Sequence, residues 1–209
     1  MKSIIPIFPL NLVVFPFSKY PLHIFEEKYK KLIIDSISAN DGFGIVSMFD
    51  NRLSEIGCFV KIDEIIKTYD NGSMDIIIKG YDRFKILNTE IGFDNDYSKS
   101  TIIPFYDEET VLINSNNVSK LIDKFKNIVD YTELSLSESY WRNLNNTIFK
   151  SFKIAEKCGL TLNQQQDLLM LQNENSRIEY LLNHFRNIDN YIENTKEMKN
   201  LILNDGYIN

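Results

Sequence analysis

The residues of this chain that could take part in catalysis or metal binding are few and widely spaced. The only histidines are His23 and His184, and they do not form the H-E-x-x-H pattern with which a helix binds zinc. Cys58 and Cys158 lie far apart and belong to no C-x-x-C pair or Cys/His cluster of zinc spacing. Neither a G-x-S-x-G elbow nor a G-x-x-x-x-G-K-[ST] phosphate loop occurs. The sequence therefore predicts no metal, no cofactor, no ATP hydrolysis and no catalytic triad.

Several residues in the first half have both a chemical and a structural interpretation. Glu26 and Glu27 could form an acid/base pair, but the helix dipole also favours acidic residues at the start of a helix. His23 could act as a base, but within Pro-Leu-His-Ile-Phe it is also placed to hydrogen-bond the backbone near that helix start. A serine–lysine pair stays open, because both residue types are common, although no local pattern marks one lysine as buried. We expect structural roles for His23, Glu26 and Glu27.

The composition is that of a globular chain with an acidic surface. Hydrophobic residues make up 44% and charged residues 25% of the chain, which excludes disorder as the main state. The formal net charge of −6 repels phosphate backbones, so we expect no nucleic acid partner. The two cysteines are expected to be free, buried thiols in a reducing cytoplasm, with a disulfide or a redox role as the alternative.

The apolar N-terminal segment is expected to be neither a signal peptide nor a membrane span. Prolines at positions 6, 9 and 16 and an asparagine at position 11 interrupt it, and no small-x-small cleavage site follows. No apolar run in the chain approaches the ~18 residues that a membrane span requires. We therefore expect a cytoplasmic protein with no membrane partner.

Residues before position 114 show the pattern of short strands. Apolar runs bounded by turn residues predict seven strands, at 4–10, 12–15, 43–49, 59–68, 74–79, 83–87 and 101–106. Asp70-Asn71-Gly72 predicts a tight hairpin turn, because an Asn-Gly pair supplies the positive φ angles of such turns. Seven short strands predict a closed or nearly closed barrel.

One helix is expected among these strands. Its apolar stripe consists of Phe25, Tyr29, Leu32, Ile33 and Ile37. Charged residues fill the other face, with the acids first and the lysines after them, as the helix dipole favours. The stretch Asn40-Asp41-Gly42 predicts the end of this helix.

Residues after position 117 show the pattern of helices. Apolar stripes follow each other along 118–129, 141–155, 168–171 and 178–192, and Gly159 ends the second helix. Capping boxes are predicted at Ser135 with Glu138, Thr161 with Gln164, and Ser176 with Glu179. Four such helices predict a bundle. We place a β-barrel domain at residues 1–113 and an α-helical bundle domain at 118–209, with 194–209 as a tail that continues weakly as a helix.

Several short motifs follow one another in a fixed order along residues 4–190. They are Pro6-Ile7-Phe8-Pro9-Leu10, Val14-Phe15-Pro16, 21–26 with Tyr29, Phe43-Gly44-Ile45-Val46, Ile56-Gly57, Gly80-Tyr81-Asp82-Arg83-Phe84, Ile154-Ala155, 160–171 and Arg177-Ile178. Together they resemble the amino-terminal, substrate-binding domain of the Lon protease family. The residues that carry these family motifs, and for which we expect structural roles, are Pro9, Pro16, Pro21, His23, Phe25, Glu26, Gly80, Arg83 and Phe84.

The resemblance implies an α+β fold, in which a PUA-like, mostly antiparallel β-barrel with one helix precedes a C-terminal α-helical bundle. In full-length relatives this region helps to recognise unfolded or tagged polypeptides, and the ATPase and protease domains follow it. This chain stops before them, so we expect a stand-alone, non-catalytic module. It would bind unfolded or extended polypeptide, or a partner protein, in an apolar groove between barrel and bundle or at a strand edge, or act as a protease or chaperone adaptor. RNA binding and small-molecule sensing in an inter-domain cleft stay open as alternatives.

The sequence departs from the family pattern in the loop after the second motif. Phe17 stands where the family usually has glycine, and Glu27 stands where proline is frequent. We expect a reshaped loop that exposes an aromatic cluster of Phe15, Phe17 and Tyr20, which is the predicted peptide contact. The alternative is that Phe15 belongs to the core.

Arg83 is the remaining candidate for binding. We expect it to pair with Asp63, Glu64 or Asp82 across the barrel, and binding of a ligand carboxylate is the alternative.

Overall fold

The computed structural model describes residues 2–49, 52–92, 96–108 and 112–204, with side chains described as far as residue 193. Backbone contacts group the chain into two compact units. The strand unit consists of Met1–Thr110 and Ala155–Gln172, and the helix unit consists of Val111–Ile154 and Asn173–Asn209. Division of the chain into domains at 1–113 and 118–209 stays a prediction.

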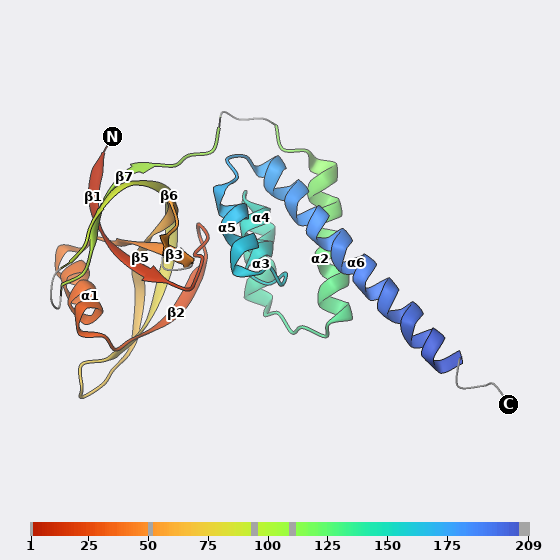
Figure 1. Cartoon of the computed structure of the whole chain (residues 1–209), viewed down its shortest axis with the longest axis horizontal. Coiled ribbons are helices and arrows are strands. Elements are labelled where there is room, and N and C mark those ends of the chain that lie inside the picture. Colours follow the sequence, from red (N-terminus) through yellow and green to blue (C-terminus); the bar gives the residue numbers. More distant parts are fainter. Residues whose placement is uncertain (1, 50–51, 93–95, 109–111, 205–209) are drawn as a thin grey trace. The chain divides into compact units, whose positions relative to one another are not determined.

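The strand unit is built on a seven-stranded sheet that closes into a ring (Figure 1). Its elements are β1 (Ser3–Leu10), β2 (Lys19–Ile24), α1 (Glu27–Ala39), β3 (Phe43–Phe49), β4 (Arg52–Leu53), β5 (Ile56–Thr68), β6 (Met74–Glu90), β7 (Lys99–Pro104) and α5 (Leu162–Met170). The strands follow the order β1-β7-β6-β5-β3, and a parallel pair between β3 and β1 closes the ring. The neighbouring pairs β1–β7, β7–β6, β6–β5 and β5–β3 are antiparallel. The predicted mostly antiparallel barrel is therefore confirmed.

Side chains that alternate along the strands fill the centre of the ring. On β6, Met74, Ile76 and Ile78 are buried, with exposed fractions of 6%, 0% and 0%, as expected for one face of a strand. The cluster of buried side chains around them consists of Phe8, Val14, Ile24, Tyr29, Leu32, Ile33, Phe43, Ile45, Cys58, Val60, Met74, Ile76, Ile78 and Tyr97. Burial of this apolar surface is the main force that holds the strand unit together.

Three of the strand predictions were wrong. Residues 12–15 form a loop rather than a strand, and Val13, Val14 and Phe15 are all buried, so these side chains fill the core without the alternation of a strand. Strand β2 was not predicted, because a proline at position 21 is atypical of strands. The runs 74–79 and 83–87 belong to the single strand β6, because the glycine between them does not form a turn.

The hairpin turn between β5 and β6 is confirmed. Gly72 has φ 77°, and the backbone N–H of Tyr69 donates to the carbonyl oxygen of Ser73 over 2.9 Å. The ammonium of Lys30 on α1 donates to the carbonyl oxygen of Asn71 over 2.8 Å. The turn is thereby anchored to the helix.

Helix α1 ends where the sequence predicted, but it begins after Phe25, and its buried face is narrower than predicted. Asn40 ends the helix in the left-handed conformation, with φ 49°. Tyr29, Leu32 and Ile33 of the predicted stripe are buried. Phe25 precedes the helix and is 63% exposed, and Ile37 is 46% exposed, so both were wrongly assigned to the core.

Helix α5 packs against strands β5 and β6 within the strand unit. The side chain of Gln166 donates to the carbonyl oxygen of Ile56 over 3.0 Å. The predicted capping box is confirmed, because Thr161 and Gln164 exchange hydrogen bonds between side chain and backbone at the start of α5.

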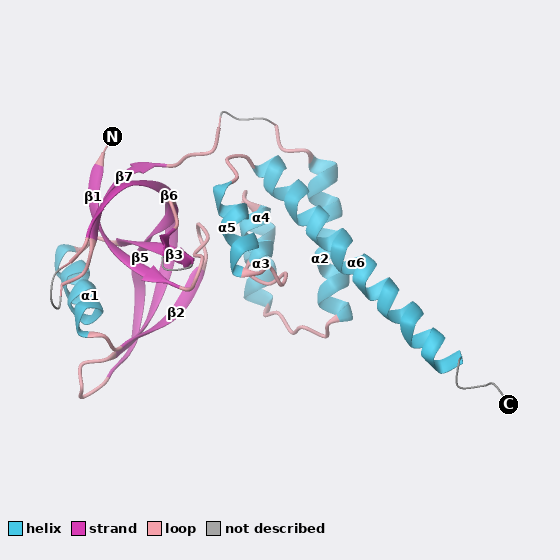
Figure 2. Ribbon diagram, in the orientation of Figure 1, coloured by secondary structure: helices cyan, strands magenta, loops and turns pink. Residues whose placement is uncertain are grey.

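The helix unit contains α2 (Ser115–Tyr131), α3 (Glu138–Asn146), α4 (Lys150–Ala155) and α6 (Glu174–Asn204), drawn in cyan in Figure 2. Helices α2 and α6 pack side by side, and the rings of Phe125 and Phe185 stack with their centroids 6.4 Å apart. The predicted C-terminal helical region is therefore confirmed. None of the described helices has an 18-residue stretch apolar enough to span a bilayer.

A buried ionic network lies between α4 and α6 in the helix unit. Arg177 is fully buried, and its Nε donates to the carboxylate of Glu174 over 3.0 Å. The same carboxylate accepts hydrogen bonds from the hydroxyl and the backbone N–H of Ser151. The guanidinium also faces the ring of Phe152, 4.5 Å from its centroid. Buried ionic groups of this kind need several partners, and here these partners join the two helices.

Two capping predictions in the helix unit were wrong. The residue that caps α3 is Ser137 rather than Ser135, since its hydroxyl accepts from the N–H of Tyr140. Helix α6 begins before Ser176, because the side chain of Asn173 accepts from the N–H of Ser176 over 3.0 Å.

One predicted helix is divided into two. The run 141–155 breaks because the ammonium of Lys150 donates to the carbonyl oxygens of Leu144, Asn145 and Thr147 and so closes α3. Helix α6 continues through the predicted tail as far as Asn204, and residues 205–209 lie outside the described part of the chain.

Candidate functional site

The predicted aromatic contact cluster is only partly exposed. Phe17 is 54% exposed, whereas Phe15 is 1% exposed and belongs to the core, so its predicted exposure was wrong. Tyr20 is half-buried and packs against the core of the barrel, and burial raises the pKa of its hydroxyl. These three residues therefore do not form one exposed surface.

The loop that carries Phe17 is held against strand β6. The N–H of Phe17 donates to the carbonyl oxygen of Gly80 over 3.0 Å, and the N–H of Gly80 donates to the carbonyl oxygen of Ser18 over 2.9 Å. A Cβ atom at Gly80 would lie 2.3 Å from the carbonyl oxygen of Phe15, so only glycine permits this approach. Phe17 is held at φ 66°, a left-handed conformation that is strained for an aromatic residue.

A pocket of about 410 Å3 opens in the strand unit where strand β2 ends and helix α1 begins. It is lined by Phe8, Pro9, Leu10, His23, Ile24, Phe25, Glu26, Lys28, Tyr29, Met48 and Ser98. Four of these residues, Pro9, His23, Phe25 and Glu26, carry the motifs for which only structural roles were expected. The structure thus brings residues from two separate motifs together around one opening.

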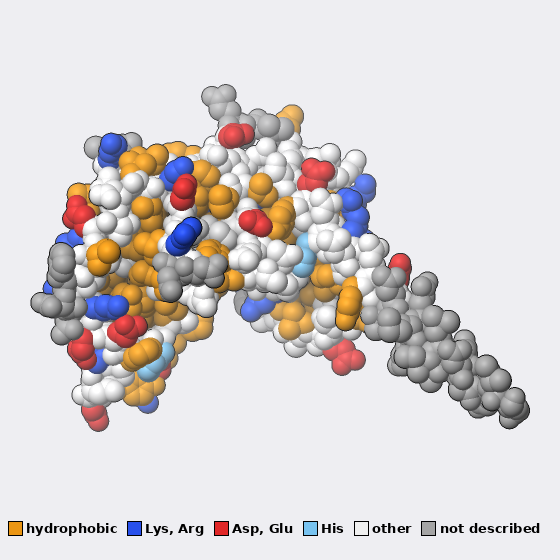
Figure 3. Space-filling model, viewed as in Figure 1, with side chains coloured by type: hydrophobic (Ala, Val, Ile, Leu, Met, Phe, Trp, Pro, Cys, Tyr) orange, Lys and Arg blue, Asp and Glu red, His pale blue; other side chains and the backbone are white. Residues whose placement is uncertain are grey.

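The walls of this pocket are mainly apolar. The rings of Phe8 and Tyr29 stack with their centroids 3.9 Å apart and join the pocket to the core. Phe25 and Met48 are 63% and 40% exposed, although both line the pocket. Hydrophobic side chains left in water around an opening are typical of binding surfaces. In Figure 3, hydrophobic side chains reach the surface over much of the strand unit.

A network of hydrogen-bonded polar groups begins at His23, which lines the pocket. The hydroxyl of Tyr69 donates to Oδ2 of Asp75 over 2.6 Å, and Nδ1 of His23 lies 2.6 Å from Oδ1 of the same carboxylate. The hydrogen bonds from Tyr69 and His23 hold the pKa of Asp75 below its usual value. The expected bond of His23 to the backbone was therefore wrong. Glu26 precedes the first turn of α1, and its carboxylate lies 3.4 Å from the ammonium of Lys28.

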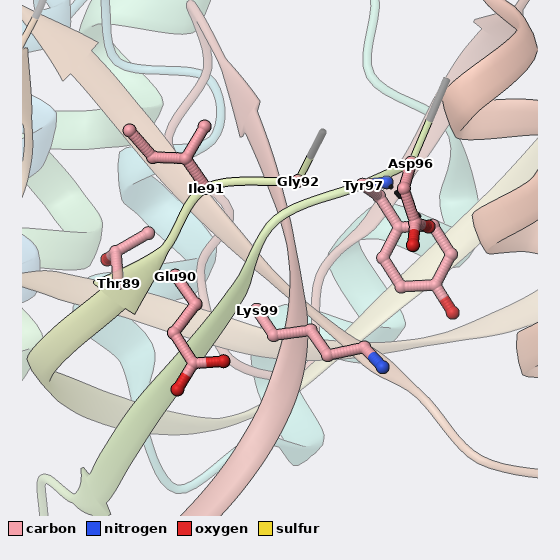
Figure 4. A pocket seen from close by; sticks show the side chains of 7 residues that line it. All are labelled: Thr89, Glu90, Ile91, Gly92, Asp96, Tyr97 and Lys99. Carbon is pink, nitrogen blue, oxygen red and sulfur yellow. Dashed lines mark hydrogen bonds between the residues drawn. The ribbon is translucent and has the colours of Figure 1, made fainter. Parts of the chain in front are cut away.

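A second pocket lies at the loop between β6 and β7 (Figure 4). Its lining residues are Thr89, Glu90, Ile91, Gly92, Asp96, Tyr97 and Lys99. The side chains drawn in Figure 4 do not converge on one point. Two of them are engaged elsewhere, since Asp96 lies 3.1 Å from the ammonium of Lys31 and the hydroxyl of Tyr97 donates to Asp35 over 2.9 Å. The opening therefore does not have the arrangement of a catalytic centre.

Arg83 is buried and holds the end of helix α5. One of its terminal nitrogens donates to the carbonyl oxygens of Leu169 and Leu171 over 2.5 and 2.7 Å. The other pairs with Asp107, so the predicted partners at positions 63, 64 and 82 were wrong. Its side chain is 4% exposed, which leaves no room for a ligand carboxylate.

The described residues offer no arrangement suited to a metal ion. No group of three or more His, Cys, Asp or Glu side chains is close enough to hold one in the described ranges. Cys58 and Cys158 are both buried, and burial raises the pKa of each thiol to about 12.

The pocket was not predictable from local sequence patterns. Phe8 and Leu10 come from β1, Tyr29 from α1 and Met48 from β3, so no local pattern links them. Only Phe25 gives a local signal for the pocket. It is a large apolar residue that lies just before α1, and so it is not part of the buried face of that helix.

Comparison with known proteins identifies the family of this chain. The family model described as the ATP-dependent protease La (LON) substrate-binding domain matches residues 4–187. The chain is 26% identical to Lon proteases of Buchnera aphidicola subsp. Baizongia pistaciae and subsp. Acyrthosiphon pisum, over 193 and 201 residues. Each alignment covers 85% of this chain and 24% of the relative. The chain thus spans about a quarter of the length of these relatives.

Solved structures show the same fold. The Lon N-terminal domain protein from Xanthomonas campestris superposes with a TM-score of 0.65 at 22% identity, over 86% of this chain and 97% of that chain. The N-terminal domain of the Mycobacterium avium complex Lon protease superposes with a TM-score of 0.62 at 15% identity, over 88% and 98% of the two chains. On its match to the family model over residues 4–187, the chain belongs to the LON substrate-binding domain family.

Proposed function

We propose that this protein binds unfolded or extended polypeptide through the pocket at the start of helix α1. The observation that carries the proposal is the exposure of Phe25 and Met48, two large apolar side chains that line one opening of about 410 Å3. Family membership supports a polypeptide-binding module in general. No catalytic role is proposed for this domain.

The pocket suits an apolar side chain of an extended polypeptide. Phe8 and Tyr29 form a packed floor, and the mobile thioether of Met48 adapts to side chains of different shape. A folded protein has its apolar side chains inside, so it offers few that could enter. Selectivity for unfolded chains follows from this difference.

Binding by side chains is favoured over addition of a strand to the sheet edge. Strand β2 pairs with β6 on one side, and its other edge includes Pro21, which has no N–H to donate. The outer half of β5 has register irregularities around Asp63 and Ile66, and such bulges block edge-to-edge pairing. We therefore place the contact in the pocket and not at a strand edge.

Binding to a reduced, unfolded protein and to the same protein in its folded form tests the proposal. We expect a measurable Kd for the unfolded form alone, by fluorescence anisotropy. Met48→Ser should weaken this binding by about tenfold, as loss of a central apolar contact does. The matched control is Leu87→Ser, because Leu87 is similarly exposed, at 45%, and lies outside the pocket.

Two results would reject the proposal. One is the absence of binding to both forms. The other is equal weakening by Met48→Ser and Leu87→Ser, which would show that the pocket has no special part in binding.

We also propose that the protein works in the cytoplasm and delivers bound chains to a separate protease or chaperone. The buried thiols of Cys58 and Cys158 fit a reducing compartment. Purification of the tagged protein from its native cells should yield such a protease or chaperone in stoichiometric amount. Recovery of the protein without one would speak against the adaptor role.

A further inference from the structure

Three rows of side chains cross the outer face of the sheet that β2, β6 and residues 61–67 of β5 form. The pairing register sets the rows as Lys19–Lys79–Lys61, Pro21–Ile77–Glu64 and His23–Asp75–Lys67. The residues of β6 between them, Ile76 and Ile78, are fully buried in the barrel. Since successive side chains of a strand point to opposite faces, the three rows point away from the core.

The first row places three lysines side by side, and we call it the lysine row. Like charges directly opposite each other on neighbouring strands destabilise a sheet. Lys19 has a partner, because its ammonium lies 2.6 Å from Oδ2 of Asp63. The ammonium of Lys79 faces the ring of Tyr81 at 5.5 Å, and Lys61 is exposed. Among the described residues, neither Lys61 nor Lys79 has a carboxylate partner.

We infer that the lysine row binds an acidic side chain of an extended polypeptide. Two ammonium groups without a carboxylate partner complement a carboxylate, and the partner would relieve a repulsion that the folded chain otherwise carries. Strands lie ~4.8 Å apart, so the long, flexible side chains of Lys61 and Lys79, which are opposite each other in the register, can reach one carboxylate placed between them. This inference rests on the proposed binding of polypeptide and adds a preference for acidic sequences.

The neighbouring row gives the partner a second contact. Pro21 and Ile77 form part of the next row. Each lies two residues along its strand from the lysine of the lysine row, Pro21 from Lys19 and Ile77 from Lys79. In an extended peptide, side chains on one face are also separated by two residues, about 6.6 Å. A peptide that runs along β2 and β6 would therefore place an acidic residue over the lysines and an apolar residue over Pro21 and Ile77.

A polypeptide fits this face better than a nucleic acid. Glu64 lies in the next row and Asp75 in the row after it, so both are within reach of any chain that continues past the lysines. A phosphate backbone carries a charge at every nucleotide, so it would meet these carboxylates, whereas a peptide can carry one acidic residue among neutral ones. The formal net charge of −6 adds to this difference.

Two labelled peptides and two double variants test the inference. The peptides have the same apolar residues at alternate positions and differ in a central Glu or Gln. At low salt we expect the full chain to bind the Glu peptide about fivefold more tightly, as for two exposed charge pairs. Lys61→Gln with Lys79→Gln should abolish this difference and leave binding of the Gln peptide unchanged. The control, Lys31→Gln with Lys85→Gln, removes the same charge from lysines that pair with Asp96 and Glu55 elsewhere in the unit.

The outcomes separate this inference from the proposed function. Equal affinity for both peptides would overturn the lysine row and leave the pocket intact, whereas no binding of either peptide would reject both. Tighter, Lys61- and Lys79-dependent binding of a single-stranded oligonucleotide would overturn the inference in favour of nucleic acid. The melting temperature of the Lys61/Lys79 variant should equal or exceed that of the control variant, because a repulsion is removed. A lower melting temperature would show that the lysines are structural.

Discussion

The guanidinium of Arg83 donates a hydrogen bond of 2.7 Å to the carbonyl oxygen of Leu171, although 88 positions separate the two residues along the chain. The last carbonyl groups of a helix have no partners within the helix, and Arg83 satisfies that of Leu169 in the same way. Strand β6 thus caps helix α5 with a buried charge. Within the strand unit this contact joins two segments that the sequence pattern assigns to different halves of the chain.

Replacement of Arg83 by Met should lower the free energy of unfolding by about 3 kcal/mol. The carbonyl groups of Leu169 and Leu171 and the carboxylate of Asp107 would all lose their buried hydrogen-bond donor. Urea denaturation measures this loss, and backbone amides of α5 should exchange with solvent faster. The control is Lys85→Met, which removes an exposed ion pair with Glu55 and should cost less than about 1 kcal/mol. Equal losses in both variants would show that Arg83 does not anchor α5.

Local signals predicted the parts of the fold that depend on local chemistry. The end of α1 at Asn40, the turn at Gly72 and the capping box at Thr161 are each set by residues within four positions of each other. Such features need no knowledge of the rest of the molecule, because the backbone conformation and the side-chain hydrogen bond that define them are local.

Features that depend on distant contacts were missed. Gly80 resembles a turn residue, but it lies inside β6. The loop around Phe15 packs so closely against it that a Cβ atom at position 80 would lie 2.3 Å from the carbonyl oxygen of Phe15. Pro21 resembles a strand breaker, but β2 pairs with a single neighbour and can lack a donor. In both cases the residue type is explained by a segment many positions away.

The candidate site was predictable only in part for the same reason. Phe15 and Phe17 are identical in type and two positions apart, yet one is buried and the other is 54% exposed. What decides this is the left-handed backbone at Phe17, which reverses the direction of the chain. The pocket beside Phe25 combines residues from strands β1, β2 and β3 and helix α1, so it exists only in the folded barrel.

Replacement of Phe17 by Gly should leave the protein about 1 kcal/mol more stable than replacement by Ala. Both variants lose the ring, but only glycine adopts φ 66° without strain, and this gain exceeds its larger entropy cost on folding. Thermal unfolding of the two variants measures the difference. Because both variants lose the predicted peptide contact at Phe17, both should bind unfolded protein equally weakly. Equal stability of the two variants would contradict the strain.

The thiols of Cys58 and Cys158 should not react with a thiol reagent at pH 8 while the protein is folded. Burial raises the pKa of each thiol to about 12, so the reactive thiolate is scarce and also inaccessible. Titration with a chromogenic disulfide should detect about two thiols in denaturant and none in buffer. Rapid reaction of one thiol in the folded state would show that its surroundings open readily.

Asp75 should make stability depend on pH on the acidic side. Hydrogen bonds from Tyr69 and His23 hold its pKa in the folded state below the ordinary value of 3.8. The carboxylate therefore binds protons less readily in the folded than in the unfolded state, and its contribution is present above pH 3.8 and lost as the pH falls through the lower, folded-state value. The free energy of unfolding of the wild type relative to Asp75→Asn should shrink as the pH falls below about 4. Asp70→Asn, which removes an exposed carboxylate from the adjacent hairpin turn, serves as the control, and the same acid dependence for both variants would contradict the role of Asp75.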